Sequence, residues 1–262
     1  MAFVRANGIV LHTRIQGRTD GPVLVFGNSL GSDFRIWEDV VRLLDDRYRI
    51  LLYDKRGHGL SDTPPPPCAI DDHVNDLLAL LDHFAIESAA IVGLSVGGMI
   101  AQRLAARAPE RVKALVLCCT GAKIGTPESW ADRIAAIDAG GIDAIAETVL
   151  ERWFTPSFHR NRATELAGWR NMLLRTPRAG YVATCAAIRD ADLRPGAASI
   201  TAPTLCVAGD HDGATPPELV RATADLIPGA RFALIEGAGH IPCVEKPDVL
   251  AELVGEHLAR HV

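Results

Sequence analysis

Short apolar segments alternate with helix-like segments along most of this chain, and no other feature constrains its fold as strongly. The strand-like segments are residues 22–26, 48–53, 89–93, 112–118, 204–208 and 232–235. The helix-like segments are residues 33–45, 70–84, 96–108, 218–227 and 248–259. This alternation predicts an α/β fold with a mostly parallel, twisted sheet and helices on both faces. The Asn7-Gly8 pair also predicts an antiparallel hairpin within residues 3–16.

The strand–helix alternation stops between residues 120 and 200. Thr126-Pro127 and Thr176-Pro177 each predict the start of a helix, because threonine caps helices and proline fits their first turn. Apolar side chains between Ile142 and Trp153 fall on one helical stripe. An insertion after a strand of an open α/β sheet would lie over the usual ligand crevice. We therefore expect a helical lid at residues 122–199 and an α/β core made of residues 1–121 and 200–262.

Charge and hydropathy argue against several classes of partner. The chain has 27 Lys and Arg residues against 32 Asp and Glu residues, a formal net charge of −5, and no basic run. This balance disfavours a nucleic-acid partner. No stretch of about 18 apolar residues occurs, so we expect no membrane-spanning helix. The first 16 residues include Arg5 and Arg14 and no long apolar run, so we expect no signal peptide and a cytoplasmic protein.

The six cysteines and nine histidines show no spacing typical of a metal or redox site. No two cysteines form a CxxC pair, and Cys118, Cys119 and Cys206 lie in apolar runs. Without a secretion signal, free buried thiols are favoured over disulfides. The histidines show no HExxH pattern. The sequence therefore predicts neither a metal nor another cofactor.

The segment Gly93–Gly98, with the sequence Gly-Leu-Ser-Val-Gly-Gly, lies between an expected strand and an expected helix. This is the context of a GxSxG nucleophile elbow, in which glycines permit a tight turn that exposes the serine hydroxyl. The turn would place Ser95 at the positive end of the helix, where a base must still activate it. An incidental serine in a glycine-rich turn is the alternative. The strand–helix context favours Ser95 as the nucleophile of an α/β-hydrolase fold.

In this fold the acid and then the histidine follow the serine along the chain. His240 directly follows the last expected strand, and we interpret it as the general base. His58 also follows an expected parallel strand, but it precedes the serine. Asp210 and Asp212 both follow the strand at residues 204–208. We favour Asp212 as the acid that orients the histidine, because it lies far enough beyond the strand to turn back; Asp210 stays open.

An oxyanion hole requires two donors directed at the charge that develops on the reacting oxygen. The backbone N–H of Val96, directly after the nucleophile, is one expected donor. The loop Asn28-Ser29-Leu30-Gly31 follows the first parallel strand, and we expect the second donor to come from this loop. We expect the second donor to be the N–H of Leu30.

Five segments match a known family: Asn28–Gly31, Asp54–Asp62, the elbow, Gly121–Thr126 and Arg152–Thr155. They resemble the 3-oxoadipate enol-lactonases, and the resemblance spans nearly the whole chain. It implies hydrolysis of 3-oxoadipate enol-lactone to 3-oxoadipate in bacterial breakdown of protocatechuate and catechol, without a cofactor. Two positions depart from the family pattern: Lys55, where a less bulky residue is expected, and Gly213, just after the acid.

The resemblance also implies a small anionic lactone as substrate, whose carboxylate calls for a cation in the pocket. Arg133, one helical turn after Trp130, is our candidate for this cation, with Trp130 and Trp153 as further substrate-binding residues. A solvated surface arginine is the alternative. A C–C bond hydrolase or an esterase would use the same triad, and a non-catalytic ligand-sensing module would share the fold. The sequence leaves the oligomeric state open.

Overall fold

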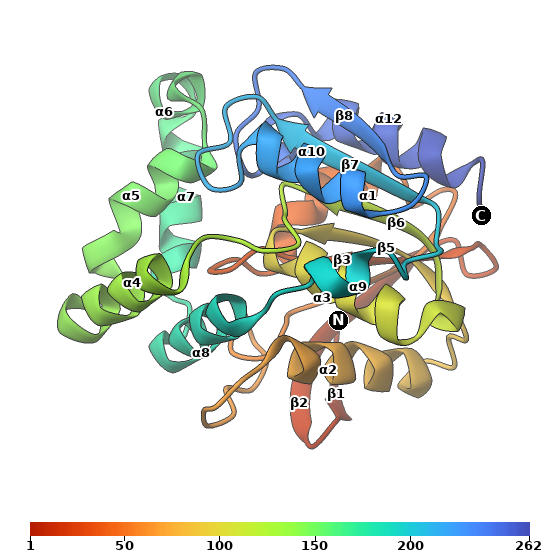
Figure 1. Ribbon diagram of the computed structural model, residues 1–262, viewed down its shortest axis with the longest axis horizontal. Coiled ribbons are helices and arrows are strands. Elements are labelled where there is room, and N and C mark those ends of the chain that lie inside the picture. The colour runs from red at the N-terminus through yellow and green to blue at the C-terminus, as the bar shows by residue number, and fades with distance from the viewer.

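The computed structural model describes residues 1–262 and contains one eight-stranded sheet in the order β1-β2-β4-β3-β5-β6-β7-β8 (Figure 1). β1 and β2 form an antiparallel hairpin, β2 also pairs antiparallel with β4, and all other pairs are parallel. The expected mostly parallel sheet with an N-terminal hairpin is thereby confirmed. The strands are β1 (Ala2–Ala6), β2 (Ile9–Gly17), β3 (Val23–Gly27), β4 (Arg49–Tyr53), β5 (Ala89–Leu94), β6 (Val112–Cys118), β7 (Thr204–Gly209) and β8 (Arg231–Ile235).

Helices pack against both faces of this sheet, as expected. Helices α2 and α3 contact each other, α3 packs on β5 and α10 on β7, whereas α1 packs with α12. Every residue of β5 and of β7 is buried, since helices exclude water from both sides of a parallel sheet. These helices are α1 (Glu38–Arg42), α2 (Ile70–His83), α3 (Val96–Arg107), α10 (Pro217–Leu226), α11 (Pro242–Glu245) and α12 (Pro247–Leu258).

The helices of residues 127–190, between β6 and β7, gather at one side of the sheet (Figure 1). The short helix of residues 194–197 lies apart from them, against α3 and α10. The apolar stripe expected between Ile142 and Trp153 is buried, with only Ile145 partly exposed. No helix of the chain has the length and apolar character needed to cross a bilayer. The helices of this insertion are α4 (Pro127–Gly140), α5 (Asp143–Trp153), α6 (Pro156–Asn161), α7 (Ala163–Leu174), α8 (Arg178–Asp190) and α9 (Arg194–Ala197).

Two expected helix boundaries are wrong. Residues 33–45 form a 3₁₀ turn, η1 (Phe34–Trp37), followed by the five-residue α1, instead of one long helix. The cause is a tertiary contact: the backbone N–H of Phe34 donates to Asp54 Oδ1 (2.9 Å) at the end of β4. Thr126 caps α4 as expected, but Thr176 does not cap α8. Its hydroxyl lies within 3.4 Å of the Met172 carbonyl and 3.3 Å of the Gly31 carbonyl, so it closes α7, and α8 starts at Arg178.

Candidate active site

Ser95 occupies a strained turn between β5 and α3. Its backbone has φ 57° and ψ −118°, a conformation that residues other than glycine rarely adopt and that often marks functional sites. A Cβ at Gly97 would lie 2.4 Å from the Gly27 carbonyl oxygen, so only glycine lets β3 approach α3 this closely. Thr120, just beyond β6, donates to the Ser95 carbonyl at 2.6 Å. The surrounding strands therefore hold the serine in place.

The loops after β7 and β8 bring Asp212 and His240 together. His240 Nδ1 lies 2.9 Å from Asp212 Oδ2, and both side chains are buried. Asp212 also accepts from the Thr215 hydroxyl (2.7 Å) and from the backbone N–H groups of Ala214 and Thr215. Burial alone would raise the pKa of Asp212, but the attraction to His240 and these hydrogen bonds outweigh it and lower the pKa. The carboxylate is thus held ionised beside the imidazole.

The alternative acid and the alternative base lie elsewhere. Asp210 Oδ1 lies 2.7 Å from Nδ1 of the exposed His211 and accepts from the Ala238 N–H, and no hydrogen bond joins Asp210 to His240. His58 is fully buried, and its Nε2 accepts from the backbone N–H of Gly31 at 3.0 Å. Burial and the nearby Lys55 lower the pKa of His58 well below its usual value, so it is neutral. Asp212 and His240 are therefore the pair whose positions suit acid and base.

His240 Nε2 faces the hydroxyls of the pocket. Ser29 Oγ lies 3.4 Å from this nitrogen, and Ser95 lines the same pocket without a hydrogen bond to His240. Catalytic hydrogen bonds of this kind often tighten only when substrate binds. Ser29 was expected only as part of the oxyanion loop, and a lone loop serine carries no signal of a contact with a histidine 211 residues away.

The two expected oxyanion donors start from different elements. Val96 is the first residue of α3, where backbone N–H groups have no partner within the helix. Leu30 lines the pocket, and its N–H has no protein acceptor. The N–H groups of its neighbours Gly31 and Ser32 are occupied by His58 and by the Ser29 carbonyl. Both expected donors are thus free to bind an oxyanion.

One pocket of about 280 Å³ joins these groups to the inserted helices. Ser29, Leu30, Ser95 and His240 lie on the core side. The expected substrate-binding residues Trp130, Arg133 and Trp153 line the opposite wall, together with Arg152 and Tyr181, which sequence reasoning missed. No aspartate or glutamate lines this pocket.

The two arginines of the pocket have no carboxylate partner. Arg133 is half-buried, and its guanidinium lies 5.1 Å from the centre of the Trp130 ring. Trp130 is fixed by a hydrogen bond from Nε1 to the Ile124 carbonyl (2.7 Å). Arg152 is exposed at the end of α5. A Cβ at Gly213 would lie 3.2 Å from the Arg152 Cα, so this departure from the family pattern lets α5 approach the acid loop.

The cysteines and the metal-ligating groups add no separate site. All six cysteines are free, as expected, and only Cys68 is not fully buried. Cys119, Asp212 and His240 place their ligand atoms within 4.8 Å of one another. This group coincides with the acid–base pair, whose imidazole and carboxylate are already bonded to each other.

The comparisons with known proteins agree with this geometry. A model of the alpha/beta hydrolase fold family matches residues 22–247. The chain is 34% identical to 3-oxoadipate enol-lactonase 2 of Acinetobacter baylyi, over 95% of this chain and 93% of that protein. The enol-lactonase of Burkholderia xenovorans superposes with a TM-score of 0.96 at 38% identity, covering 98% of this chain and all of that one. A thermophilic esterase of Thermogutta terrifontis, solved with malate bound, superposes with a TM-score of 0.92 at 28% identity, covering 100% and 99%.

The model match covers far more than half of the chain, and the enol-lactonase relatives match nearly its full length. The resemblance that the motifs indicated is therefore confirmed. The chain belongs to the α/β-hydrolase family, where it is similar to the 3-oxoadipate enol-lactonases, and it is a hydrolase.

Proposed function

We propose that this hydrolase opens 3-oxoadipate enol-lactone to 3-oxoadipate through an acyl-enzyme on Ser95. One observation carries the proposal: a strained serine, a buried His240–Asp212 pair and two arginines without carboxylate partners line a single pocket. A serine, a histidine and an aspartate in this arrangement catalyse acyl transfer. The two arginines favour the binding of an ester that carries a negative charge. The names of the relatives from Acinetobacter and Burkholderia support the lactone as substrate. The reaction would serve the breakdown of aromatic compounds.

The proposed reaction has two steps at the same carbonyl carbon. Ser95 Oγ attacks this carbon while His240 Nε2 takes its proton, and the N–H groups of Leu30 and Val96 stabilise the oxyanion. The ring C–O bond then breaks, and His240 returns the proton to the enol oxygen. Because an enolate is less basic than an alkoxide, it leaves more readily. Water next gives a proton to His240 and attacks the acyl carbon, the ester bond to Ser95 Oγ breaks, and His240 returns the proton to this oxygen. The product has a new carboxylate, and its enol isomerises to the ketone.

The substrate's own carboxylate would bind at the wall formed by the inserted helices. Arg133 is the first candidate, because it is half-buried and Trp130 holds its guanidinium plane. Arg152 provides a second cation at the exposed end of α5. Malate, the ligand named for the Thermogutta esterase, is itself a dicarboxylate. We propose that residues 122–199 act as the lid that recognises the anion, while the core carries the chemistry.

Loss of enol-lactone absorbance on addition of the purified chain tests the proposal. We expect turnover of the lactone with a kcat/KM well above that for p-nitrophenyl acetate, a neutral ester. Ser95→Ala is the control that separates enzymatic from spontaneous hydrolysis. Preferred turnover of a neutral ester, or cleavage of a C–C bond in a ring-fission product, would replace the lactone as substrate. No turnover of any of the three would indicate a binding module.

A further inference from the structure

Lys55 is a fully buried lysine directly behind the proposed active site. It follows β4, is 1% exposed, and its ammonium donates to the carbonyls of Ser29 (2.6 Å) and Ser32 (3.2 Å). Burial lowers the pKa of Lys55 from 10.5 to about 7, although the carboxylates of Asp54 and Asp33 oppose this shift. Burial of an ammonium costs folding free energy unless other groups compensate it. A buried lysine at this position therefore indicates a role other than stability.

The loop that Lys55 holds is the oxyanion loop, residues 28–32. Asn28 Nδ2 donates to the Ser32 carbonyl (2.6 Å), and the Ser32 hydroxyl donates to the Ser29 carbonyl (2.9 Å). His58 accepts from the Gly31 N–H (3.0 Å). These contacts occupy the Ser29 and Ser32 carbonyls and the Gly31 N–H, whereas the N–H of Leu30 stays unbonded.

The Ser29 carbonyl and the Leu30 N–H belong to the same peptide group. In a planar trans peptide the C=O and the N–H point in opposite directions. An ammonium that binds the oxygen on one side therefore fixes the direction of the N–H on the other. The positive charge also polarises the peptide group, which strengthens the N–H as a donor.

We propose that Lys55 is a positioning residue that orients and polarises the Ser29–Leu30 peptide group, the donor of the oxyanion hole. The ammonium does not touch the substrate; it acts through the backbone of the loop. The inference rests on the proposed nucleophile and oxyanion hole, but not on the identity of the lactone.

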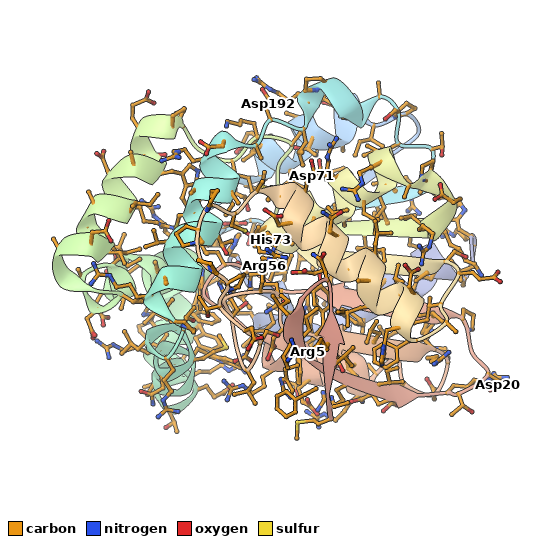
Figure 2. All side chains as sticks on the ribbon, turned by 90° about the horizontal axis from the view of Figure 1, so that it is seen from below. Arg5, Asp20, Arg56, Asp71, His73 and Asp192 are labelled. Carbon is orange, nitrogen blue, oxygen red and sulfur yellow. The ribbon has the colours of Figure 1, made fainter.

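The other ionisable groups near Lys55 are accounted for. Asp33 and Asp54 attract the ammonium, and His58 is neutral. His73 lies beside Arg56 at the start of α2 (Figure 2). Burial, with repulsion from Lys55 and Arg56, lowers the pKa of His73 to about 3, so it is also neutral. His12 Nδ1 lies 2.8 Å from Asp54 Oδ2, so it also faces this cluster. His58 and His73 stay neutral over the range in which Lys55 releases its proton.

Lys55→Met tests the proposal, because methionine keeps the length of the side chain and removes the charge. We expect kcat for both p-nitrophenyl acetate and the enol-lactone to fall by about 10–100-fold, part of the loss seen when an oxyanion donor is removed. KM should change by less than about threefold, since an oxyanion forms only after binding. Each carbonyl keeps another donor, from Ser32 or Asn28, so the loop should stay folded.

Lys123→Met is the matched control. Its ammonium also donates to two backbone carbonyls, those of Arg189 (2.7 Å) and Ala191 (2.8 Å), but at the end of α8. This variant should retain the parent's kcat. Equal losses in both lysine variants, or an unchanged kcat in Lys55→Met, would overturn the proposal, as would a loss confined to KM.

Two measurements remain decisive if Lys55→Met does not fold. Lys55→Gln keeps a neutral donor, and it should lower kcat less than tenfold. The parent should lose kcat at high pH as Lys55 releases its proton, whereas Lys55→Gln should not, and an equal fall in both proteins would overturn the proposal. If the parent hydrolyses the neutral ester but not the lactone, only the proposed substrate is wrong. The role of Lys55 can then still be tested on the neutral ester.

Discussion

The α/β core and the inserted helices contribute to the pocket in different ways. Ser95, Asp212 and His240 come from the core, and all three are buried; Ser95 keeps 8% exposure to the pocket. Hydrogen bonds to neighbouring strands and loops fix the elbow and the carboxylate. In contrast, Arg133 and Arg152 come from the insertion, are more exposed, and form no ion pair. The core therefore holds the three side chains of the triad in fixed positions, whereas the insertion presents two positively charged side chains to the pocket.

The largest expected effect is the loss of the proposed nucleophile. Ser95→Ala should leave a folded protein and lower kcat by about 10⁴–10⁶ on the lactone and the neutral ester alike, because both need the same acyl-enzyme. Circular dichroism and thermal melting check the fold, and steady-state rates check the activity. If the loss were confined to one substrate, the core would not be the common chemical machinery, and turnover equal to the parent's would remove Ser95 from the mechanism.

The next effect compares two carboxylates on one core loop. Asp212→Asn should lower kcat by about 10³–10⁴, because an amide no longer fixes the imidazole in the required tautomer. Asp210→Asn should change kcat by less than about fivefold, since Asp210 pairs with His211 at the surface. Steady-state rates of the two purified variants decide between the residues. A larger loss in Asp210→Asn would exchange their roles.

The strands and the elbow of the core were predicted more closely than the helices of the insertion, because strands and tight turns depend on residues close together in the sequence. β6 begins and ends at the expected residues, and the elbow glycines stand where the backbone leaves no room for a Cβ. Strand order, then, brings the loops after β5, β7 and β8 to one edge of the sheet. From chain order and from their positions after two expected strands, His240 and Asp212 were predicted as partners, and the structure places them in contact.

What escaped prediction depends on contacts between distant segments. The 3₁₀ turn at Phe34 follows from Asp54, and the late start of α8 follows from the contacts of Thr176. Arg152 belongs to a segment that matches the family, but its place in the pocket escaped prediction because it depends on how closely α5 approaches Gly213. Lys55 stood out only as a departure from a family pattern, and its role requires the geometry of a loop about 25 residues earlier.

A change in the insertion should alter substrate choice without removing the chemistry. We expect Arg133→Ala to lower kcat/KM for the enol-lactone by about 10–100-fold, or about 1.4–2.7 kcal/mol, through loss of a charge-assisted hydrogen bond. The rate on p-nitrophenyl acetate should change by less than about threefold. Arg152→Ala should have a smaller effect, because its exposed guanidinium remains solvated.

Arg160→Ala is the control for these arginine variants, since Arg160 is exposed on α6 and lies outside the pocket. It should match the parent on both substrates. Equal losses on both substrates in Arg133→Ala would mean that Arg133 supports the structure of the insertion. No loss on either would leave Arg133 a surface residue and move anion recognition to Arg152.

The last comparison concerns stability, because Lys55 in the core should make the Tm depend on pH by a few degrees per unit. Burial lowers the pKa of Lys55 to about 7 from 10.5, so between these values the unfolded chain keeps a proton that the folded chain has released. The free energy of unfolding then rises with pH by about 1.4 kcal/mol per unit from this group, and below pH 7 the cost of burying the ammonium is fully present.

Lys55→Met lacks this contribution. The difference in Tm between parent and variant should therefore move in the parent's favour by a few degrees per unit from pH 7 to 10. Thermal melts of both proteins at pH 6 to 10 measure this difference, because groups common to both cancel. A constant difference across that range would show that the folded core does not release the Lys55 proton.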